Sequence, residues 1–368
     1  MANQSASEAT QTAANSNLTS AGAAMRRGKV ADKVAETLAM LSGLYGLGTA
    51  LFLALGLAPG EELPVVGLFN TLLPALLFPA VALAIGWLAA RRWKLAALMA
   101  PAILALVSGY AALFLPRPLP PASAPQLSVL TFNLHAERVA LAPMVEVIRA
   151  AGADIVALQE LSPEAARMFS AELGDVYPYR ALHLHPSNPV MGQGVLSKYP
   201  LRDSVYWQVE MWHQRVTVTM RERDIALYNV HPNIPFVLTA SGLAFDAGKR
   251  GRDIADILER AGRERTPVIL AGDFNMTDRC AHYRGVTANY RDAFRDAGWG
   301  FGFTFPDFSS PNALPRGLPR VALPLPLLTR IDYVFYSEHF QAAEAFVWPS
   351  AGGSDHRPVL ARLAVVRQ

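Results

Sequence analysis

Cysteine is almost absent from this chain, because Cys280 is the only one in 368 residues. A single cysteine excludes an intramolecular disulfide, so a folded domain here must be stabilised by its own core. It also excludes a cysteine-rich zinc centre, and the histidines show no zinc-type spacing. The cellular compartment stays open, because many domains outside the cytoplasm also lack disulfides.

Charged residues are also scarce in part of the chain. Asp, Glu, Lys and Arg are missing from three long apolar stretches, residues 37–60, 63–90 and 95–116. About 20 helical residues cross a hydrocarbon core of about 30 Å, so each stretch is long enough to span a membrane. Buried helices of a soluble bundle are the alternative, but such helices usually keep a polar face. We therefore expect three transmembrane helices over residues 37–116, after a polar, disordered cytoplasmic tail over residues 1–36.

The charges that flank these stretches predict an orientation. Basic residues precede the first stretch and join the second to the third, at Arg26, Arg27, Lys29, Lys33, Arg91, Arg92 and Lys94. The opposite connections hold Glu61, Glu62 and one arginine, Arg117. By the positive-inside rule the N-terminus is cytoplasmic and the region after Pro121 is extracytoplasmic, in a multi-pass protein of the cell (inner) membrane. A proline-rich linker over residues 117–125 then leads to a domain over residues 126–368.

Net charge is missing from that domain. The residues after Pro121 carry 25 basic and 25 acidic side chains, so the net charge of +3 belongs to the N-terminal part. Affinity for nucleic acid depends on Lys and Arg, so a neutral domain disfavours a nucleic-acid partner without excluding it. Strand-like and helix-like patterns alternate here, with an amphipathic helix predicted over 253–261 and a buried strand over 267–271. This alternation is typical of an α/β domain.

Polar residues recur where the apolar runs end. Six such ends carry Asn, Asp, Glu or His: TFN at 131–133, LQE at 158–160, NVH at 229–231, GDFN at 272–275, RIDY at 330–333 and SDHRP at 354–358. Strand ends of an α/β fold converge on one rim, so six distant motifs can form one site. In this order they resemble the motifs of the endonuclease/exonuclease/phosphatase superfamily, over residues 126–368. The resemblance implies a two-sheet α/β sandwich with metal-dependent phosphoester hydrolase activity, here preceded by three transmembrane helices.

The residue types suit that reaction. Hydrolysis of a phosphate ester needs neutralisation of phosphoryl charge, an activated water and help for the leaving oxygen. Carboxylate and amide oxygens suit Mg²⁺ or Mn²⁺, and we predict Glu160 as a direct ligand with Asn133 and Asp355 beside it. His356 is the predicted general base, because the pKa of imidazole lies near the working pH, and Asp332 would orient it.

The resemblance implies roles for three further motif residues. Asp273 and Asn275 would position the nucleophilic water and the phosphate, while His231 would donate a hydrogen bond to a phosphoryl oxygen. The other histidines considered match no family motif and are expected on the surface or rim, at His183, His185, His213, His282 and His339.

Two features bear on the substrate. Lys249, Arg250 and Arg252 open the helix after the His231 loop and are candidate contacts to a second phosphate, or a solvated basic turn. The loops 232–247 and 309–328 are apolar and rich in Pro and Gly. They indicate a binding or membrane-contacting surface, or segments that pack on the domain.

The predicted architecture suggests a lipid substrate. Three spans and an external catalytic domain resemble membrane-anchored proteins similar to the teicoplanin-resistance membrane phosphatase, which implies a polyprenyl-pyrophosphate-type lipid. An extracytoplasmic nuclease with the same catalytic residues is the first alternative. A non-catalytic membrane binding protein is the second. The sequence leaves the oligomeric state open.

Overall fold

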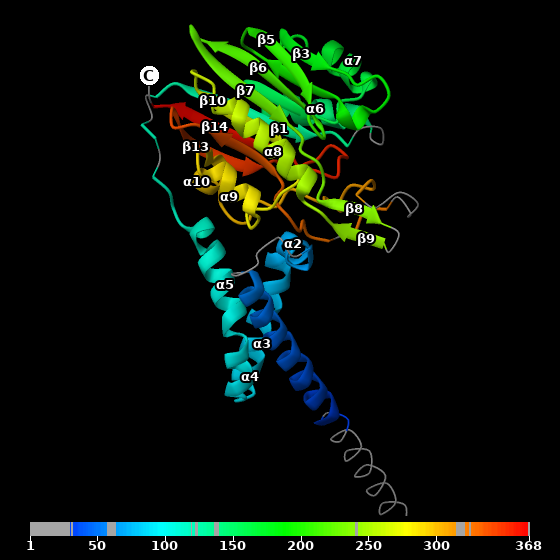
Figure 1. The fold of residues 1–368 in the computed structure, drawn as a ribbon, viewed down its shortest axis with the longest axis vertical. Helices are drawn as coiled ribbons and strands as arrows, with labels where there is room; N and C mark the ends of the chain where they lie inside the picture. Colours follow the sequence, from blue (N-terminus) through cyan, green and yellow to red (C-terminus); the bar gives the residue numbers. More distant parts are fainter. Residues whose placement is uncertain are drawn as a thin grey trace, which may run out of the picture. The chain divides into compact units, whose positions relative to one another are not determined.

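The computed structural model describes residues 30, 32–56, 64–118, 120–121, 124–135, 140–239, 242–313, 321–323 and 325–366. The chain divides into two compact units, Met1–Ala58 with Leu77–Leu106, and Pro59–Leu76 with Val107–Gln368. The second unit contains both large sheets and all six motifs (Figure 1). Most of the predicted tail over residues 1–36 lies outside the described residues.

The apolar N-terminal region is helical but more divided than the sequence predicts. Among the described residues, one helix, Asp32–Gly56, is long and apolar enough to cross a membrane. The prediction of three uninterrupted spans is not supported, because the second stretch contains α2 (Pro64–Thr71) and α3 (Leu73–Ala89). The third stretch is also divided, into α4 (Trp93–Leu98), α5 (Ala100–Tyr110) and the 3-10 turn η2 (Ala111–Phe114).

Proline explains where these helices restart. Pro74 and Pro101 are the second residues of α3 and α5. Proline has no backbone N–H and is favoured in a first helical turn, where that donor has no intrahelical partner. A count of uncharged residues contains no such information, so the sequence stretches appeared continuous.

The second unit is a sandwich of two mixed six-stranded sheets, as the resemblance implies (Figure 1). In spatial order the first sheet contains β13 (Phe340–Val347), β14 (Val359–Val365), β1 (Gln126–Asn133), β2 (Ile155–Gln159), β4 (Gln193–Ser197) and β3 (Tyr179–His183). The second contains β11 (Arg291–Asp292), β12 (Asp332–Tyr336), β10 (Val268–Asp273), β7 (Arg223–Val230), β6 (Trp212–Met220) and β5 (Leu201–Gln208). One parallel pair lies at the centre of each sheet, β1 with β2 and β7 with β10.

Strand alternation builds the core. In β1, Leu127 and Val129 join the core between the sheets, whereas Leu130 and Phe132 join a second core beneath helices. This follows from the alternation of side chains across a strand. The helices of the second unit beyond η2 are α6 (Leu141–Ala151), α7 (Pro163–Glu172), α8 (Gly248–Ala261), α9 (Ala281–Thr287) and α10 (Ala293–Ala297), with a 3-10 turn η3 (Pro189–Met191). A two-stranded hairpin, β8 (Phe236–Thr239) with β9 (Gly242–Phe245), lies outside both sheets.

Candidate active site

Strand ends from both sheets meet at one edge of the sandwich. Parallel strands β1 and β2 end together, with Asn133 opposite Gln159. In the other sheet β10 ends at Asp273, directly opposite Asp332, the first residue of antiparallel β12. Ser354 Oγ donates a hydrogen bond of 2.8 Å to the carbonyl oxygen of Asn133, which ties the last motif to the end of β1. Backbone pairing thus brings motifs that are far apart in sequence to a single edge.

His356 and Asp332 form the best-defined pair at this edge. Nδ1 of His356 lies 3.0 Å from Oδ2 of Asp332, and Nε2 lies 3.8 Å from Oδ2 of Asp273. The ring of Phe305 covers the imidazole, with ring centroids 4.6 Å apart. Burial lowers the pKa of His356, but the carboxylates of Asp332 and Asp273 outweigh it and hold that pKa well above its ordinary value. The pair therefore holds a proton that Asp332 stabilises and orients.

Glu160 and Asp273 share one hydrogen-bond donor and lie near one histidine. Nδ2 of Asn133 donates to Oε1 of Glu160 at 3.2 Å and to Oδ2 of Asp273 at 3.0 Å. Nε2 of His231 lies 3.8 Å from the Glu160 oxygen and 3.6 Å from the Asp273 oxygen. Burial raises the pKa of Glu160, because desolvation penalises the carboxylate form. These contacts gather two carboxylates from different sheets around one histidine and one amide.

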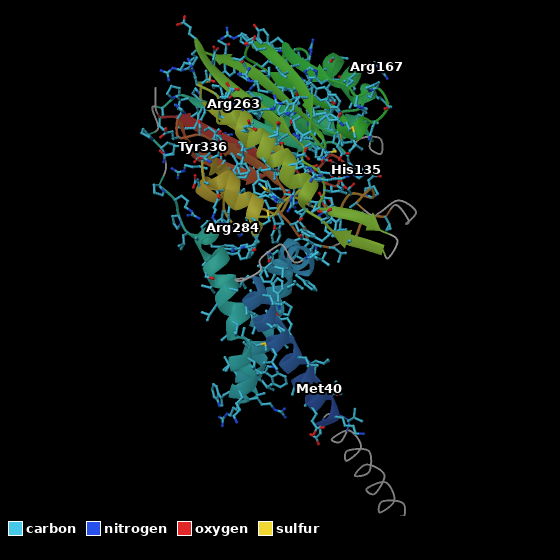
Figure 2. The ribbon with its side chains drawn as sticks, viewed as in Figure 1. Met40, His135, Arg167, Arg263, Arg284 and Tyr336 are labelled. Atoms are coloured by element: carbon cyan, nitrogen blue, oxygen red, sulfur yellow. The ribbon has the colours of Figure 1, made fainter. Side chains whose placement is uncertain are left out.

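His135 also lies at this edge, although no sequence motif pointed to it. Its Nδ1 lies 2.6 Å from Oδ1 of Asp355, and its backbone N–H donates to Oδ1 of Asn133 at 3.0 Å (His135 is labelled in Figure 2). Burial lowers the pKa of His135, but Asp355 more than offsets this, so the pKa is raised. The signal was present in the sequence, since His135 follows Asn133 by two residues beyond the same strand end.

The backbone at this edge is strained at three positions, two within motifs and one beside a motif. His135 and Glu160 have φ of 55°, and Asn275 has φ of 49°. Residues other than glycine rarely adopt this left-handed conformation, and such strain concentrates at functional sites. The Asn275 backbone N–H donates to Oδ1 of Asp273 at 2.9 Å, and its Nδ2 donates to the carbonyl of Pro232 at 3.0 Å. These two bonds hold the Asn275 side chain beside the carboxylates.

The donors at this edge suit a hard divalent cation. Glu160, Asp273, Asp332 and Asp355 place four carboxylates here, and their ion pairs in the described part of the chain are with histidines alone. Ligand atoms of Asp273, Asp332 and His356 lie within 4.8 Å of one another. Carboxylates at this density favour a bound divalent cation, because its charge compensates their mutual repulsion. The residues present therefore fit a divalent metal.

Asn133 and Asp355 were predicted beside Glu160 as metal ligands. Asn133 turns its amide nitrogen to the carboxylates, while its oxygen accepts from His135. In this orientation the amide supports Glu160 and Asp273. Asp355 lies at the same edge and faces His135. Among the described residues, Asp273, Asp332 and His356 form a group that could hold a metal ion, a grouping that the sequence motifs did not single out.

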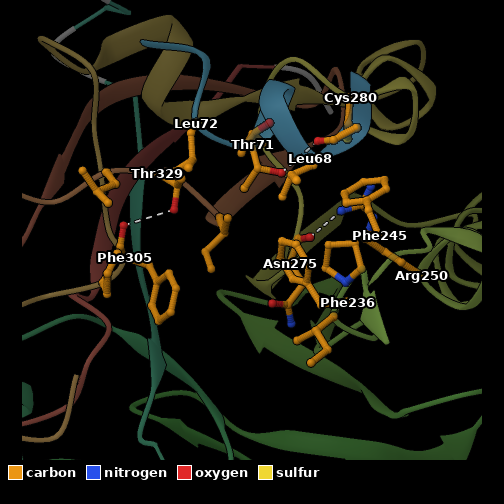
Figure 3. Close-up of a pocket in the computed structure, with 17 residues that line it drawn as sticks. Leu68, Thr71, Leu72, Phe236, Phe245, Arg250, Asn275, Cys280, Phe305 and Thr329 are labelled. Carbon is orange, nitrogen blue, oxygen red and sulfur yellow. Dashed lines mark hydrogen bonds between the residues drawn. The ribbon is translucent and has the colours of Figure 1, made fainter. Parts of the chain in front are cut away.

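The three basic residues predicted near the substrate separate in the structure. Arg250 is 2% exposed and lines a pocket of about 410 Å³ beside the site (Figure 3). Lys249 is exposed, and Arg252 is paired with Glu210 at 2.7 Å. Helical geometry explains the difference, because neighbouring positions on α8 point to different sides.

The histidines outside the motifs also lie in different environments. His213 is fully buried and its Nε2 lies 3.2 Å from Oδ1 of Asp253, so the expected surface or rim position is wrong for this residue. Asp253 also accepts from the backbone N–H of Asn233 at 2.9 Å. The pair thus anchors the loop after His231 to α8. Burial, together with the charge of Arg250, lowers the pKa of His282 to about 4.

Comparisons with known proteins agree with this fold. Residues 130–356 match the model of the Endonuclease/Exonuclease/phosphatase family. The endonuclease/exonuclease/phosphatase from Bacteroides vulgatus is similar with a TM-score of 0.51 and 18% identity, over 66% of this chain and 100% of that chain. A family protein from Bacteroides thetaiotaomicron has a TM-score of 0.50 and 15% identity, over 66% of this chain and 99% of its own.

A third solved structure is D. rerio TDP2 complexed with single strand DNA product. It has a TM-score of 0.51 and 16% identity, over 65% of this chain and 99% of that chain. Identities at this level show a shared fold. No curated protein matches the chain.

Proposed function

The chain belongs to the endonuclease/exonuclease/phosphatase family, and from that premise we propose that it is a metal-dependent phosphoesterase acting on a lipid phosphate at a membrane. The superfamily and sandwich predictions are confirmed. The observation that carries the proposal is the meeting of Glu160, His231, Asp273 and His356 at one buried edge beside an apolar pocket. The bond hydrolysed is a phosphate ester or a pyrophosphate bond of a polyprenyl-pyrophosphate-type lipid.

The residues divide the chemistry between them. His356 transfers the proton of the attacking water, and Asp332 holds the imidazole in place through Nδ1. Asp273 and Asn275 position the water and the phosphate. His231 donates a hydrogen bond to a phosphoryl oxygen, which stabilises charge that develops in the transition state.

Metal binding completes this assignment. Glu160 and Asp355, together with Asp273, would hold Mg²⁺ or Mn²⁺. Such an ion would supply positive charge that neutralises the phosphoryl oxygens and makes the attacking water more acidic. Burial raises the pKa of the Glu160 carboxyl, as expected for a ligand whose ionised form depends on a nearby cation.

Two observations support a membrane lipid as substrate. The helix Asp32–Gly56 is long and apolar enough to anchor the protein in a bilayer. Ile234 and Leu325, from the two apolar loops, are each 52% exposed. Anchoring raises the effective concentration of a substrate held at the same surface, and a soluble substrate gains nothing from it.

The finer membrane topology also remains part of this proposal. The flanking basic residues favour a cytoplasmic N-terminus and an extracytoplasmic catalytic domain. The shorter apolar helices Leu73–Ala89 and Ala100–Phe114 would then complete a multi-pass anchor. The likeness to the teicoplanin-resistance membrane phosphatase rests on this same architecture.

An extracytoplasmic nuclease is the second candidate, and stacked rings on the first half of the domain favour it. His183 stacks on Tyr206 with centroids 4.9 Å apart, and Tyr206 stacks on Trp212 at 4.4 Å. His183 on β3 pairs with Gln193 on β4, and Gln193 pairs with Gln159 on β2. His183 therefore lies at the same end of the strands as Gln159, which precedes Glu160. Bases of a single strand stack on such rings. The neutral charge of the domain opposes this candidate.

Phosphate release by the purified full-length protein tests these candidates. In detergent with Mg²⁺, we expect hydrolysis of p-nitrophenyl phosphate and, with higher kcat/KM, of a polyprenyl diphosphate, both lost with EDTA. Efficient cleavage of single-stranded DNA without activity on any lipid phosphate would transfer the assignment to the nuclease. Absence of both turnover and Mn²⁺ binding in calorimetry would leave a non-catalytic binding protein.

A further inference from the structure

The pocket beside the candidate active site is lined by segments that are distant in sequence. Helix α2, the β8–β9 hairpin and the loop before β12 each contribute apolar side chains, all within the second unit (Figure 3). We propose that this pocket binds the apolar chain of a lipid diphosphate and that Arg250 binds the phosphoryl group joined to that chain. The inference rests on the phosphoesterase function proposed above, and adds which part of the substrate each wall recognises.

The pocket is continuous with the catalytic edge, the side of the sandwich where Asp273 and Asp332 lie opposite each other. Asn275 lines it, and the backbone N–H of the same residue donates to Asp273 at 2.9 Å. Phe305 also lines it and covers the imidazole of His356 at 4.6 Å. A phosphoryl group at the catalytic edge and a chain in the pocket can therefore belong to one molecule.

Helix α2 forms one wall against the hairpin. A Cβ atom on Gly67 would lie 2.1 Å from Cε1 of Phe245, so only glycine permits this approach. Phe245 in turn packs edge-on against Phe236, with centroids 5.8 Å apart. Leu68 lines the pocket and is 39% exposed. Exposed aliphatic side chains at the wall of a concave site are typical of sites that bind an apolar ligand.

Arg250 is the anion-binding element. Among the described lining residues it is the only charged one, and it is 2% exposed. Its Nη1 donates to the carbonyl of Asn275 at 2.6 Å, Nη2 lies 3.3 Å from Nδ1 of His282, and Nε has no partner. Both contacts are neutral acceptors, since the pKa of His282 is lowered to about 4 by burial and by Arg250. A buried cation without a carboxylate is unfavourable until an anion binds.

The catalytic edge and Arg250 together set how a diphosphate lies in the site. The terminal phosphoryl group lies at the catalytic edge, and the chain-linked phosphoryl group lies at Arg250. The water oxygen bonds to the terminal phosphorus, and the bond from that phosphorus to the bridging oxygen breaks. The products are inorganic phosphate and the chain-linked monophosphate, and the water proton passes to His356. Arg250 stabilises the negative charge that the leaving monophosphate acquires.

A chain-length series tests the apolar wall. For the full-length protein with Mg²⁺, kcat/KM should rise at least tenfold per isoprene unit from dimethylallyl to geranyl to farnesyl diphosphate, until the pocket is full. Each buried methylene group is worth about fourfold. Gly67→Val, which displaces Phe245, and Leu68→Gln, which makes the wall polar, should each lower the farnesyl-to-dimethylallyl ratio at least tenfold. Gly285→Val is the matched control, because Gly285 is an exposed helical glycine facing open space.

A second comparison tests Arg250. Wild type should prefer farnesyl diphosphate over farnesyl monophosphate, and Arg250→Gln should reduce that preference roughly ten- to a hundredfold, the worth of a charged hydrogen bond. Arg250→Lys should retain part of it. Arg263→Gln, a change at an exposed arginine paired with Glu259, is the matched control. Equal losses on both substrates in Arg250→Gln would show a structural role instead.

The outcomes distinguish failure of the pocket assignment from failure of the phosphoesterase function. Hydrolysis of p-nitrophenyl phosphate combined with a flat chain-length series, or with unchanged ratios in both wall variants, overturns the pocket assignment alone. Loss of all phosphate release in wild type overturns the phosphoesterase function beneath it. Melting temperatures close to wild type show that each variant is folded.

Discussion

The His356 and Asp332 pair permits a quantitative test of the assigned proton transfer. Positioned acid–base groups contribute about 10²- to 10⁴-fold to rate, equivalent to roughly 3–5 kcal/mol of activation free energy. Asp332 contacts Nδ1 of His356 at 3.0 Å, and in the proposed mechanism it acts through that contact. If that is its whole role, removing His356 also removes the benefit of Asp332. His356→Ala and Asp332→Asn should each lower kcat/KM by about 10²- to 10⁴-fold, and the double variant by little more than the worse single one.

The pH profile supplies an independent readout. The carboxylates raise the pKa of His356, so activity that needs neutral His356 should rise with pH through a value above the ordinary one. Asp332→Asn removes a negative neighbour, which lowers that pKa and moves the rising limb to lower pH. The assay is steady-state hydrolysis of p-nitrophenyl phosphate with Mg²⁺, with melting temperature as the control for folding. Losses that multiply in the double variant would contradict a shared role of the two residues, and would fit an independent role of Asp332 as a metal ligand.

Three further predictions concern the metal, the contact between His282 and Arg250, and the topology. Glu160→Gln should raise the Mg²⁺ concentration needed for half-maximal activity at least tenfold, and unchanged dependence in a metal titration would remove Glu160 from the metal site. Because His282 has a pKa of about 4 when folded, the unfolded chain binds more protons between about pH 6.5 and 4. The melting temperature should therefore decrease as the pH is lowered across that window, and it should decrease less steeply in His282→Gln. An identical slope in this variant would contradict the lowered pKa of His282. Alkaline phosphatase fused after Gln368 should be active, whereas a fluorescent cytoplasmic reporter there would reverse the orientation.

Regular elements with strong patterns were predictable from the sequence. The run at 267–271 is found in β10 (Val268–Asp273), with all six residues of that strand buried, and the helix predicted over 253–261 lies within α8. A strand buried on both faces is mostly apolar, as Val268–Ala271 is in β10, so its sequence carries a clear signal. The N-terminal helices were less predictable, because an uncharged apolar stretch does not show that a new helix begins one residue before Pro74 and one residue before Pro101.

The candidate site shows the same division. Glu160 and Asp273 were identified because their motifs follow apolar runs, and His356 because its motif is contiguous over residues 354–358. His135 was missed because its role depends on Asp355, more than two hundred residues away in sequence, at 2.6 Å in space. Arg250 appeared equivalent to its neighbours because a basic cluster in a sequence does not reveal which side chain points inward.

By itself the sequence determined the α/β class, the acid, amide and histidine inventory, and an apolar N-terminal region, because residue type and hydrophobic period set these properties. Tertiary structure decided which of these groups meet. Strand register placed Asp273 opposite Asp332, and helical geometry buried Arg250 while leaving Lys249 exposed. It also brought α2 against the β8–β9 hairpin at Gly67 and closed the apolar pocket. Such contacts join residues far apart in the chain, and they arise from the packing of whole elements, which a local sequence pattern does not encode.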